Sequence, residues 1–181
     1  MKFFRKNMFI LLIAFVFSFG FLSSNVQAAS EKKLSAKESS KLASEIKKIE
    51  KEYKKLVSDS TSIKKQAAIS IKELDNVVVL LEETQSTTEE DLSEVIEILK
   101  EARIDYVEIV KEIDAPIKGV NKKISSLKKT YKKQSYSKSM KSVKTIKKAL
   151  KEEFDYNIIV DEAITVLKES LIEIKAEIET L

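Results

Sequence analysis

The chain contains no cysteine, no histidine and no tryptophan among its 181 residues. Without cysteine there can be no disulfide, no thiol nucleophile and no lipid-modified N-terminal cysteine. Histidine is the commonest general base near neutral pH and a common zinc ligand, so its absence removes much of the chemistry that enzymes use. We therefore expect a protein that is not an enzyme and that uses no cofactor.

Paired carboxylates remain possible as catalytic groups, since Glu89, Glu90, Asp91 and Glu94 crowd one predicted helix start. Acidic residues in a first helical turn are expected from the helix dipole alone. The sequence has no calcium-binding loop of the helix–loop–helix type and no glycine-rich phosphate loop. We therefore name no catalytic, cofactor-binding or metal-binding residue and expect no small-molecule substrate.

Glycine and proline are also scarce, and after residue 28 only Gly119 and Pro116 occur. Seven of the eight phenylalanines precede residue 29, which leaves Phe154 alone in the rest of the chain. Such a composition lacks the turn residues of a multistranded sheet and is typical of long helices or coiled coils. The fold class that we predict is all-α.

The first residues have the pattern of an export leader. Lys2, Arg5 and Lys6 precede the uncharged apolar run Met8–Leu22, and small residues follow in Val26–Ala28. We predict a signal peptide over 1–28 with cleavage after Ala28, and hence a secreted or cell-envelope protein. An uncleaved N-terminal anchor is the alternative. The leader style and the preference for lysine over arginine resemble exported proteins of Gram-positive-like bacteria.

Beyond the leader, apolar residues recur at alternating steps of four and three, the spacing of helices that pack along a coiled-coil-like seam. Polar turns separate three segments, and Thr88 with Asp91 resembles a capping box at the second helix start. We predict one domain over 29–181, an elongated antiparallel bundle of three long helices over roughly 31–83, 88–133 and 137–181. Arg103 stands at a seam position, where we expect its stem to lie along the core, or else to set register with a partner.

Weaker interruptions occur at Ser58–Ser62, Asp114–Gly119 and Asp155–Asn157, and they fall at similar heights in such a bundle. Pro116 disfavours helix at Ala115, yet the apolar seam keeps its register through it. This continuity favours long helices that are locally kinked. The alternative is a shorter bundle of five or six helices that fold back at these interruptions.

Charge is strongly segregated along the chain. Residues 117–151 hold thirteen lysines and no acidic residue, and residues 29–57 are also net basic. Residues 82–116 hold twelve acidic and three basic residues, and 152–181 hold nine and two. The long bundle would place the basic segments in one half and the acidic ones in the other, whereas folding back would largely cancel the field.

The strongest candidate for a contact surface is a lysine cluster with two tyrosines around the second predicted turn. Lysine is a point charge without the bidentate geometry of arginine, so the binding that we expect is salt-sensitive, with no specific nucleic-acid readout. A purely structural role as the solvated flank of a coiled coil is the competing interpretation. The candidate polyanion-binding residues are Lys128, Lys129, Tyr131, Lys132, Lys133, Tyr136, Lys138 and Lys141.

These observations predict an exported, non-enzymatic binding or scaffold protein that docks on an anionic cell-wall polymer or an anionic membrane surface. Two alternatives remain open at this point. One is a protein–protein interaction module that associates with itself or with another helical protein. The other is a helical component of a membrane-active, toxin-like system.

Overall fold

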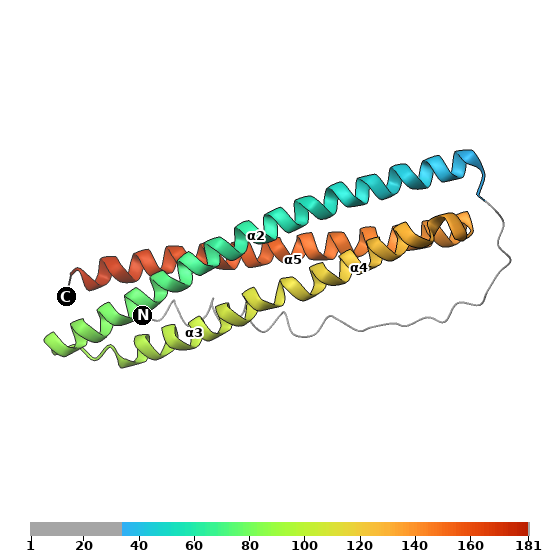
Figure 1. Ribbon diagram of the computed structural model, residues 1–181. Coiled ribbons are helices and arrows are strands. Elements are labelled where there is room, and N and C mark those ends of the chain that lie inside the picture. Colours follow the sequence, from blue (N-terminus) through green and yellow to red (C-terminus); the bar gives the residue numbers. More distant parts are fainter. Residues whose placement is uncertain (1–33, 181) are drawn as a thin grey trace. The chain divides into compact units, whose positions relative to one another are not determined.

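The computed structural model describes residues 34–180, and these residues form three long helical rods packed side by side (Figure 1). The all-α bundle of three long helices is therefore confirmed, whereas the predicted leader lies outside the described residues. The elements in chain order are α2 (Ala36–Thr87), α3 (Ser93–Glu112), α4 (Asp114–Thr130), the 3₁₀ helix η1 (Tyr131–Lys133) and α5 (Tyr136–Ile178).

The second rod consists of α3 and α4, which follow one another in line and run antiparallel to α2 (Figure 1). Ion pairs from one end to the other show this direction, because the residue number rises on the second rod as it falls on α2. The alternative in which the helices fold back at Pro116 is thereby excluded. The pairs are Glu82–Lys100, Asp75–Arg103, Lys64–Asp114 and Glu50–Lys128.

The third rod, α5, runs parallel to α2 in a fixed register. Three contacts join residues that are always 102 positions apart: Glu45 with Lys147, Gln66 with Lys168, and Glu73 with Lys175. At 1.5 Å per residue, the 52 residues of α2 span about 78 Å and the 43 residues of α5 about 65 Å. The two connections between rods, 88–92 and 134–135, are short and lie at opposite ends of the bundle.

The apolar seam predicted from the spacing forms the core. Leu42, Ile49, Leu56, Ile113 and Ile164 are each at most 1% exposed. Burying a side chain of this size contributes about 1.5–3 kcal/mol, so a continuous row of them outweighs the exposed ion pairs that link the rods.

The seam was predicted wrongly at Arg103. Ala102 takes the buried position, and Arg103 is exposed, with Nε 2.5 Å from Oδ1 of Asp75 on α2. A straight helix has 3.6 residues per turn, whereas a strict seven-residue repeat corresponds to 3.5. Over several turns the positions of such a repeat therefore rotate away from the core. The guanidinium thus joins two rods at the surface, through its ion pair with Asp75.

The junction between α3 and α4 is a local interruption of one rod. Ile113 keeps right-handed helical angles (φ −58°, ψ −37°) although it belongs to neither helix. Pro116 is the third residue of α4 and lacks the N–H that would otherwise reach the Glu112 carbonyl. The Tyr156 hydroxyl on α5 donates to the Ile109 carbonyl at 3.3 Å and supports α3 just before the junction.

The first connection differs from the prediction. The helix α2 continues through 84–87, and Thr88 serves as its C-cap, with its N–H and hydroxyl both donating to the Thr84 carbonyl at 2.9 Å. The predicted capping box of Thr88 and Asp91 is therefore wrong. The Asp91 carboxylate instead accepts the backbone N–H of Ser93 at 3.1 Å, where α3 begins.

Candidate polyanion-binding surface

The structure gathers the eight residues singled out in the sequence at the end of the bundle where α2 and α5 begin (Figure 1). Lys128 and Lys129 lie in the last turn of α4, and Tyr131, Lys132 and Lys133 form η1. The remaining three, Tyr136, Lys138 and Lys141, lie at the start of α5. We call all eight residues together the basic tip.

Local capping and apolar contacts hold the basic tip in place. Gln134 is extended and ends η1, and the Ser135 hydroxyl accepts the Lys138 N–H at 3.4 Å to start α5. Tyr131 and Tyr136 are half-buried and pack against the main core cluster. The two tyrosines therefore fix the backbone, and the lysines project from it.

Two lysines near the tip are neutralised by α2. Lys128 Nζ lies 2.5 Å from Glu50 Oε1, and Lys147 Nζ lies 2.5 Å from Glu45 Oε2. The hydrogen bond from Lys147, with a second from Lys48, holds the pKa of the Glu45 carboxyl below its usual value. This carboxylate stays charged in the bundle and fastens α2 to α5.

The other lysines of the tip have no such partner. Within residues 34–180, no carboxylate lies at ion-pair distance from five of the six lysines that were predicted to bind a polyanion. Lys132 instead stands over the Tyr131 ring, 5.9 Å from its centroid. The five lysines are Lys129, Lys132, Lys133, Lys138 and Lys141.

The helix dipole of α5 places further partial positive charge at the basic tip, because α5 begins there. Lys138 lies in the first turn of α5, a turn that holds no acidic residue. A cation at this position opposes the helix dipole and costs about 0.3–1 kcal/mol, whereas Lys128 and Lys129 in the last turn of α4 are favoured by it. Helix stability thus accounts for Lys128 and Lys129 but not for Lys138.

Beside the tip, an open groove of about 400 Å³ runs between α2 and η1. Its lining combines two apolar residues of α2 with three lysines and one tyrosine. Lys47 is a groove residue that the sequence did not point to, because only the packing shows which face of α2 lies here. The groove is lined by Ala43, Ile46, Lys47, Lys128, Tyr131 and Lys132.

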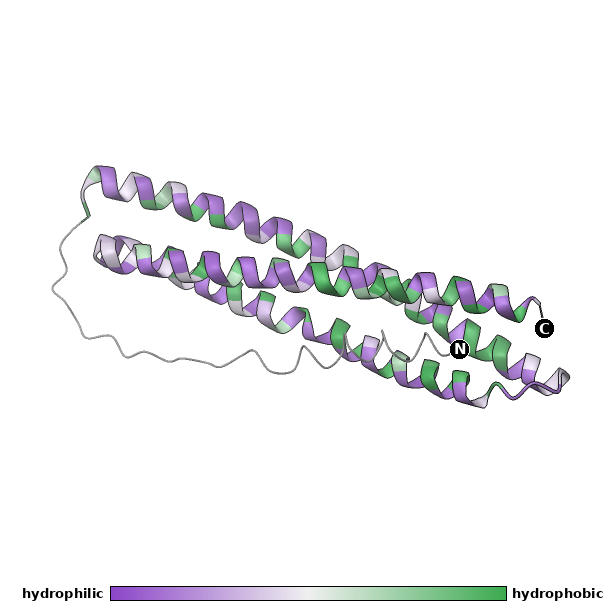
Figure 2. Cartoon of the chain, turned by 180° about the vertical axis from the view of Figure 1, so that it is seen from behind, coloured by the Kyte–Doolittle hydropathy of each residue, from purple (hydrophilic) through white to green (hydrophobic). Residues whose placement is uncertain are grey.

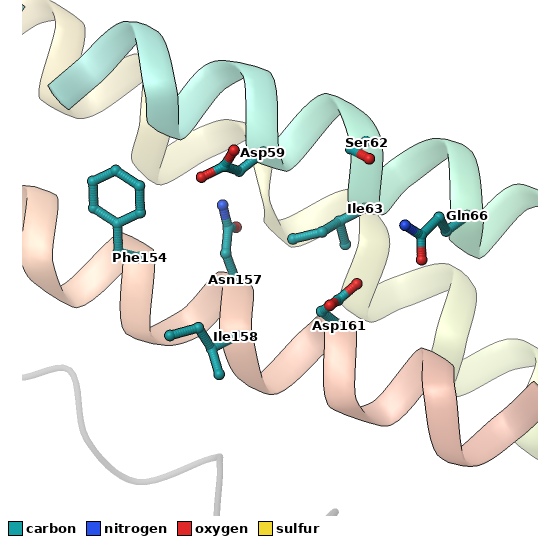
Figure 3. A pocket seen from close by; sticks show the side chains of 8 residues that line it. All are labelled: Asp59, Ser62, Ile63, Gln66, Phe154, Asn157, Ile158 and Asp161. Atoms are coloured by element: carbon teal, nitrogen blue, oxygen red, sulfur yellow. The ribbon is translucent and has the colours of Figure 1, made fainter. Parts of the chain in front are cut away.

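A second groove, of about 280 Å³, lies halfway along α2 and α5 (Figure 3). Asp59 and Gln66 on α2 face Phe154, Asn157 and Asp161 on α5 across it. Asn157 is 4% exposed, and its Nδ2 donates to the Ser60 hydroxyl at 2.8 Å. The side chains here join the two helices.

No group of three or more acidic side chains in residues 34–180 is arranged to hold a metal ion. None of the helices in that range combines the length and the apolar content that a bilayer crossing demands.

The described residues thus define an all-α protein, a three-rod bundle whose most distinctive surface is the basic tip. No protein-family model, no curated protein and no solved structure matches the chain.

Proposed function

We propose that this chain is an exported, non-enzymatic scaffold that docks on an anionic polymer of the cell envelope through its basic tip. The observation that carries the proposal is the cluster of five lysines without carboxylate partners in the described residues. These lie where α4 ends and α5 begins. The bundle would hold this charge at one end of a long spacer.

The distribution of apolar groups favours a polymer over a membrane surface. Within residues 34–180, the large hydrophobic residues that are exposed are Val57, Ile69, Val79, Leu80, Ile104, Ile158, Val166 and Ile172, and none of these belongs to residues 117–151. Peripheral membrane proteins usually insert apolar side chains beside their lysines. Figure 2 shows the same asymmetry, with hydrophilic residues dominating the end that holds η1.

The test is retention of the purified protein on immobilised poly(glycerol phosphate) across a NaCl series from about 50 to about 500 mM. Liposomes of anionic and of neutral lipid form parallel arms. We expect retention on the polymer to fall steeply with salt, because each neutralised phosphate releases a counterion. Retention that does not change with salt would contradict the electrostatic mechanism, and binding to anionic liposomes alone would favour the membrane.

The variant Lys129→Gln/Lys132→Gln/Lys133→Gln removes three of the unpaired tip charges. We expect it to reduce the slope of log affinity against log salt by about 2, since each charge accounts for roughly 0.7 to 0.9 of the slope.

The matched control is Lys65→Gln/Lys72→Gln/Lys111→Gln. It lowers the net charge equally at three exposed lysines that have no carboxylate within ion-pair distance in residues 34–180. Equal losses in the two variants would mean that net charge, and not the basic tip, governs binding.

A further inference from the structure

A row of exposed side chains runs along the outer face of the C-terminal half of α5. The residues recur at every seventh position, so they lie on one stripe of the helix. Ile158 and Ile172 are 56% and 67% exposed, and together with Ile69 on α2 and Ile104 on α3 they are the most exposed isoleucines of residues 34–180. The stripe consists of Lys151, Ile158, Thr165, Ile172 and Glu179, all of them exposed.

This stripe is complementary to itself when it is read backwards. Around Thr165, the two isoleucines exchange places, and Lys151 takes the position of Glu179. If a second copy lies antiparallel with the two Thr165 residues opposite each other, isoleucine meets isoleucine and lysine meets glutamate. A closed, two-fold symmetric interface requires this kind of self-complementarity.

In this register, the residues that flank the stripe on the side of α2 would also form favourable contacts with the second copy. Asp161 would face Lys168 of the second copy, and Phe154 would face its Lys175. Asp161 has no basic partner within residues 34–180, and Lys168 makes only a 3.4 Å hydrogen bond to Gln66. Each copy therefore has an unused carboxylate where the other copy has a weakly held ammonium group.

The opposite flank carries one unfavourable contact. Glu162 would lie near Glu169 of the second copy, and both are exposed. Like charges at such positions weaken a helix pair by amounts similar to those that opposite charges contribute. The stripe thus fits a reversible association, and a substitution at either Glu162 or Glu169 should strengthen it, because the two-fold axis repeats this contact.

We propose that two copies of this chain associate through the stripe, with their α5 helices antiparallel and a two-fold axis at Thr165. The basic tips then point in opposite directions, about 90 Å apart, since the starts of the two α5 helices lie some 58 residues of helix from each other. The proposal does not depend on polymer binding, because the stripe lies outside the basic tip.

The absence of native cysteine makes a cross-linking test clean. In Thr165→Cys, mild oxidation is expected to yield a disulfide-linked dimer, because residues on the axis face each other. The matched control is Lys144→Cys, on the same stripe seven residues before Lys151, where the two thiols would be roughly 60 Å apart. Failure of Thr165→Cys to cross-link above the level of Lys144→Cys would overturn the proposal.

Sedimentation across a concentration series measures how the charged residues of the stripe contribute to dimer affinity, in variants that contain no cysteine. Glu179→Lys should weaken the dimer roughly tenfold, because two symmetry-related ion pairs become like-charge contacts. Lys151→Glu should weaken it as well, but this change also breaks the 3.3 Å ion pair of Lys151 with Asp155 within α5. The swap Lys151→Glu/Glu179→Lys should restore it, and Glu162→Lys should tighten it. The control Lys111→Glu on α3 should have no effect, and a swap that stays monomeric would exclude this register.

Discussion

At the scale of single residues, the most informative feature is a polar pair inside an apolar core. Ser60 and Asn157 are 2% and 4% exposed, and the Asn157 amide donates to the Ser60 hydroxyl, which donates in turn to the Leu56 carbonyl at 2.7 Å. A buried polar pair contributes little net stability but disfavours other registers, since a shift would leave both groups unpaired. This pair fixes the register of α2 against α5.

Replacing one member of the pair should therefore cost more than replacing both. Ser60→Ala leaves the buried Asn157 amide without its acceptor, and we expect a loss of about 1–3 kcal/mol in the free energy of unfolding. Ser60→Ala/Asn157→Leu should recover most of this loss, because an apolar pair needs no partner. Urea unfolding followed by circular dichroism measures both values, and a double variant less stable than the single one would contradict this account.

At the scale of the elements, the second rod shows how one residue divides a helix without reversing it. Pro116 removes one backbone hydrogen bond in the first turn of α4, yet Ile113 remains helical and Ile117 stays buried. The apolar contacts on both sides of the junction hold α3 and α4 in line against α2. The proline is thus tolerated as a local kink.

Pro116→Ala should convert α3 and α4 into one uninterrupted helix. The variant regains a hydrogen bond and loses the proline clash, and both changes stabilise the folded state. They should outweigh the entropic cost of a more flexible unfolded chain, so we expect the free energy of unfolding to rise by about 1–2 kcal/mol. Amide hydrogen exchange supplies the measurement. In the wild type the amides around residues 113–117 should exchange faster than their neighbours, and in the variant they should not. A destabilised variant would show that the kink is required for packing.

The elements also show what the sequence could and could not predict. The three rods were predictable because the spacing of apolar residues reflects a core that must be continuous. The end of α2 was not predictable in this way, because the helix continues through a polar segment that looks like a turn, where the hydroxyls of Thr84 and Thr87 donate to the carbonyls of Leu80 and Glu83. Polar composition alone does not distinguish these two outcomes.

The basic tip was predictable for a different reason. Lys128 to Lys141 are close in the sequence on either side of a turn, so any hairpin brings them together. The groove residue Lys47 and the partners Glu45 and Glu50 come from α2, some eighty residues or more away. Their place depends on the rotation of α2 about its axis, which only the packed core determines.

At the scale of the whole helical unit, charge and titration follow from composition. Without histidine or cysteine, hardly any side chain changes charge between about pH 6 and 9, so stability should be nearly constant there. On the acid side, hydrogen bonds from Lys147, Lys175 and Lys64 lower the pKa values of Glu45, Glu73 and Asp114, respectively. Their stabilising contribution is complete above the pKa of the unfolded chain and is lost as pH falls through the lowered values.

The carboxyl of Glu153 has the opposite effect on the pH dependence of stability. Burial, followed by the neighbouring Glu152, raises the pKa of Glu153, so its neutral form is favoured in the bundle and its contribution grows as the solution becomes more acidic. Glu45, Glu73 and Asp114 each form an ion pair that joins two rods, whereas Glu153 forms no ion pair within residues 34–180. We therefore expect thermal stability to decline below about pH 4, with Glu153 reducing the decline but not reversing it.

The alkaline side should show a steeper loss, caused by two tyrosines that join α5 to α3. The hydroxyl of Tyr106 donates to the Ala163 carbonyl at 2.9 Å, and that of Tyr156 donates to Ile109. Burial, with nearby carboxylates, raises the pKa of each to about 12. A raised pKa means that the stabilising contribution is complete below the unfolded value near 10 and is lost as pH rises from there to about 12.

For Tyr106, the rise of the phenol pKa to about 12 on folding corresponds to about 2–3 kcal/mol of stability lost at full ionisation. Tyr106→Phe should lose about 1 kcal/mol at pH 7, where the hydrogen bond to Ala163 is missing, and should show a smaller further loss between about pH 9 and 12. Thermal unfolding measured at each pH, together with tyrosinate absorbance, tests this directly. If wild type and variant lose stability in parallel above about pH 10, lysine deprotonation and not the buried phenol controls alkaline unfolding.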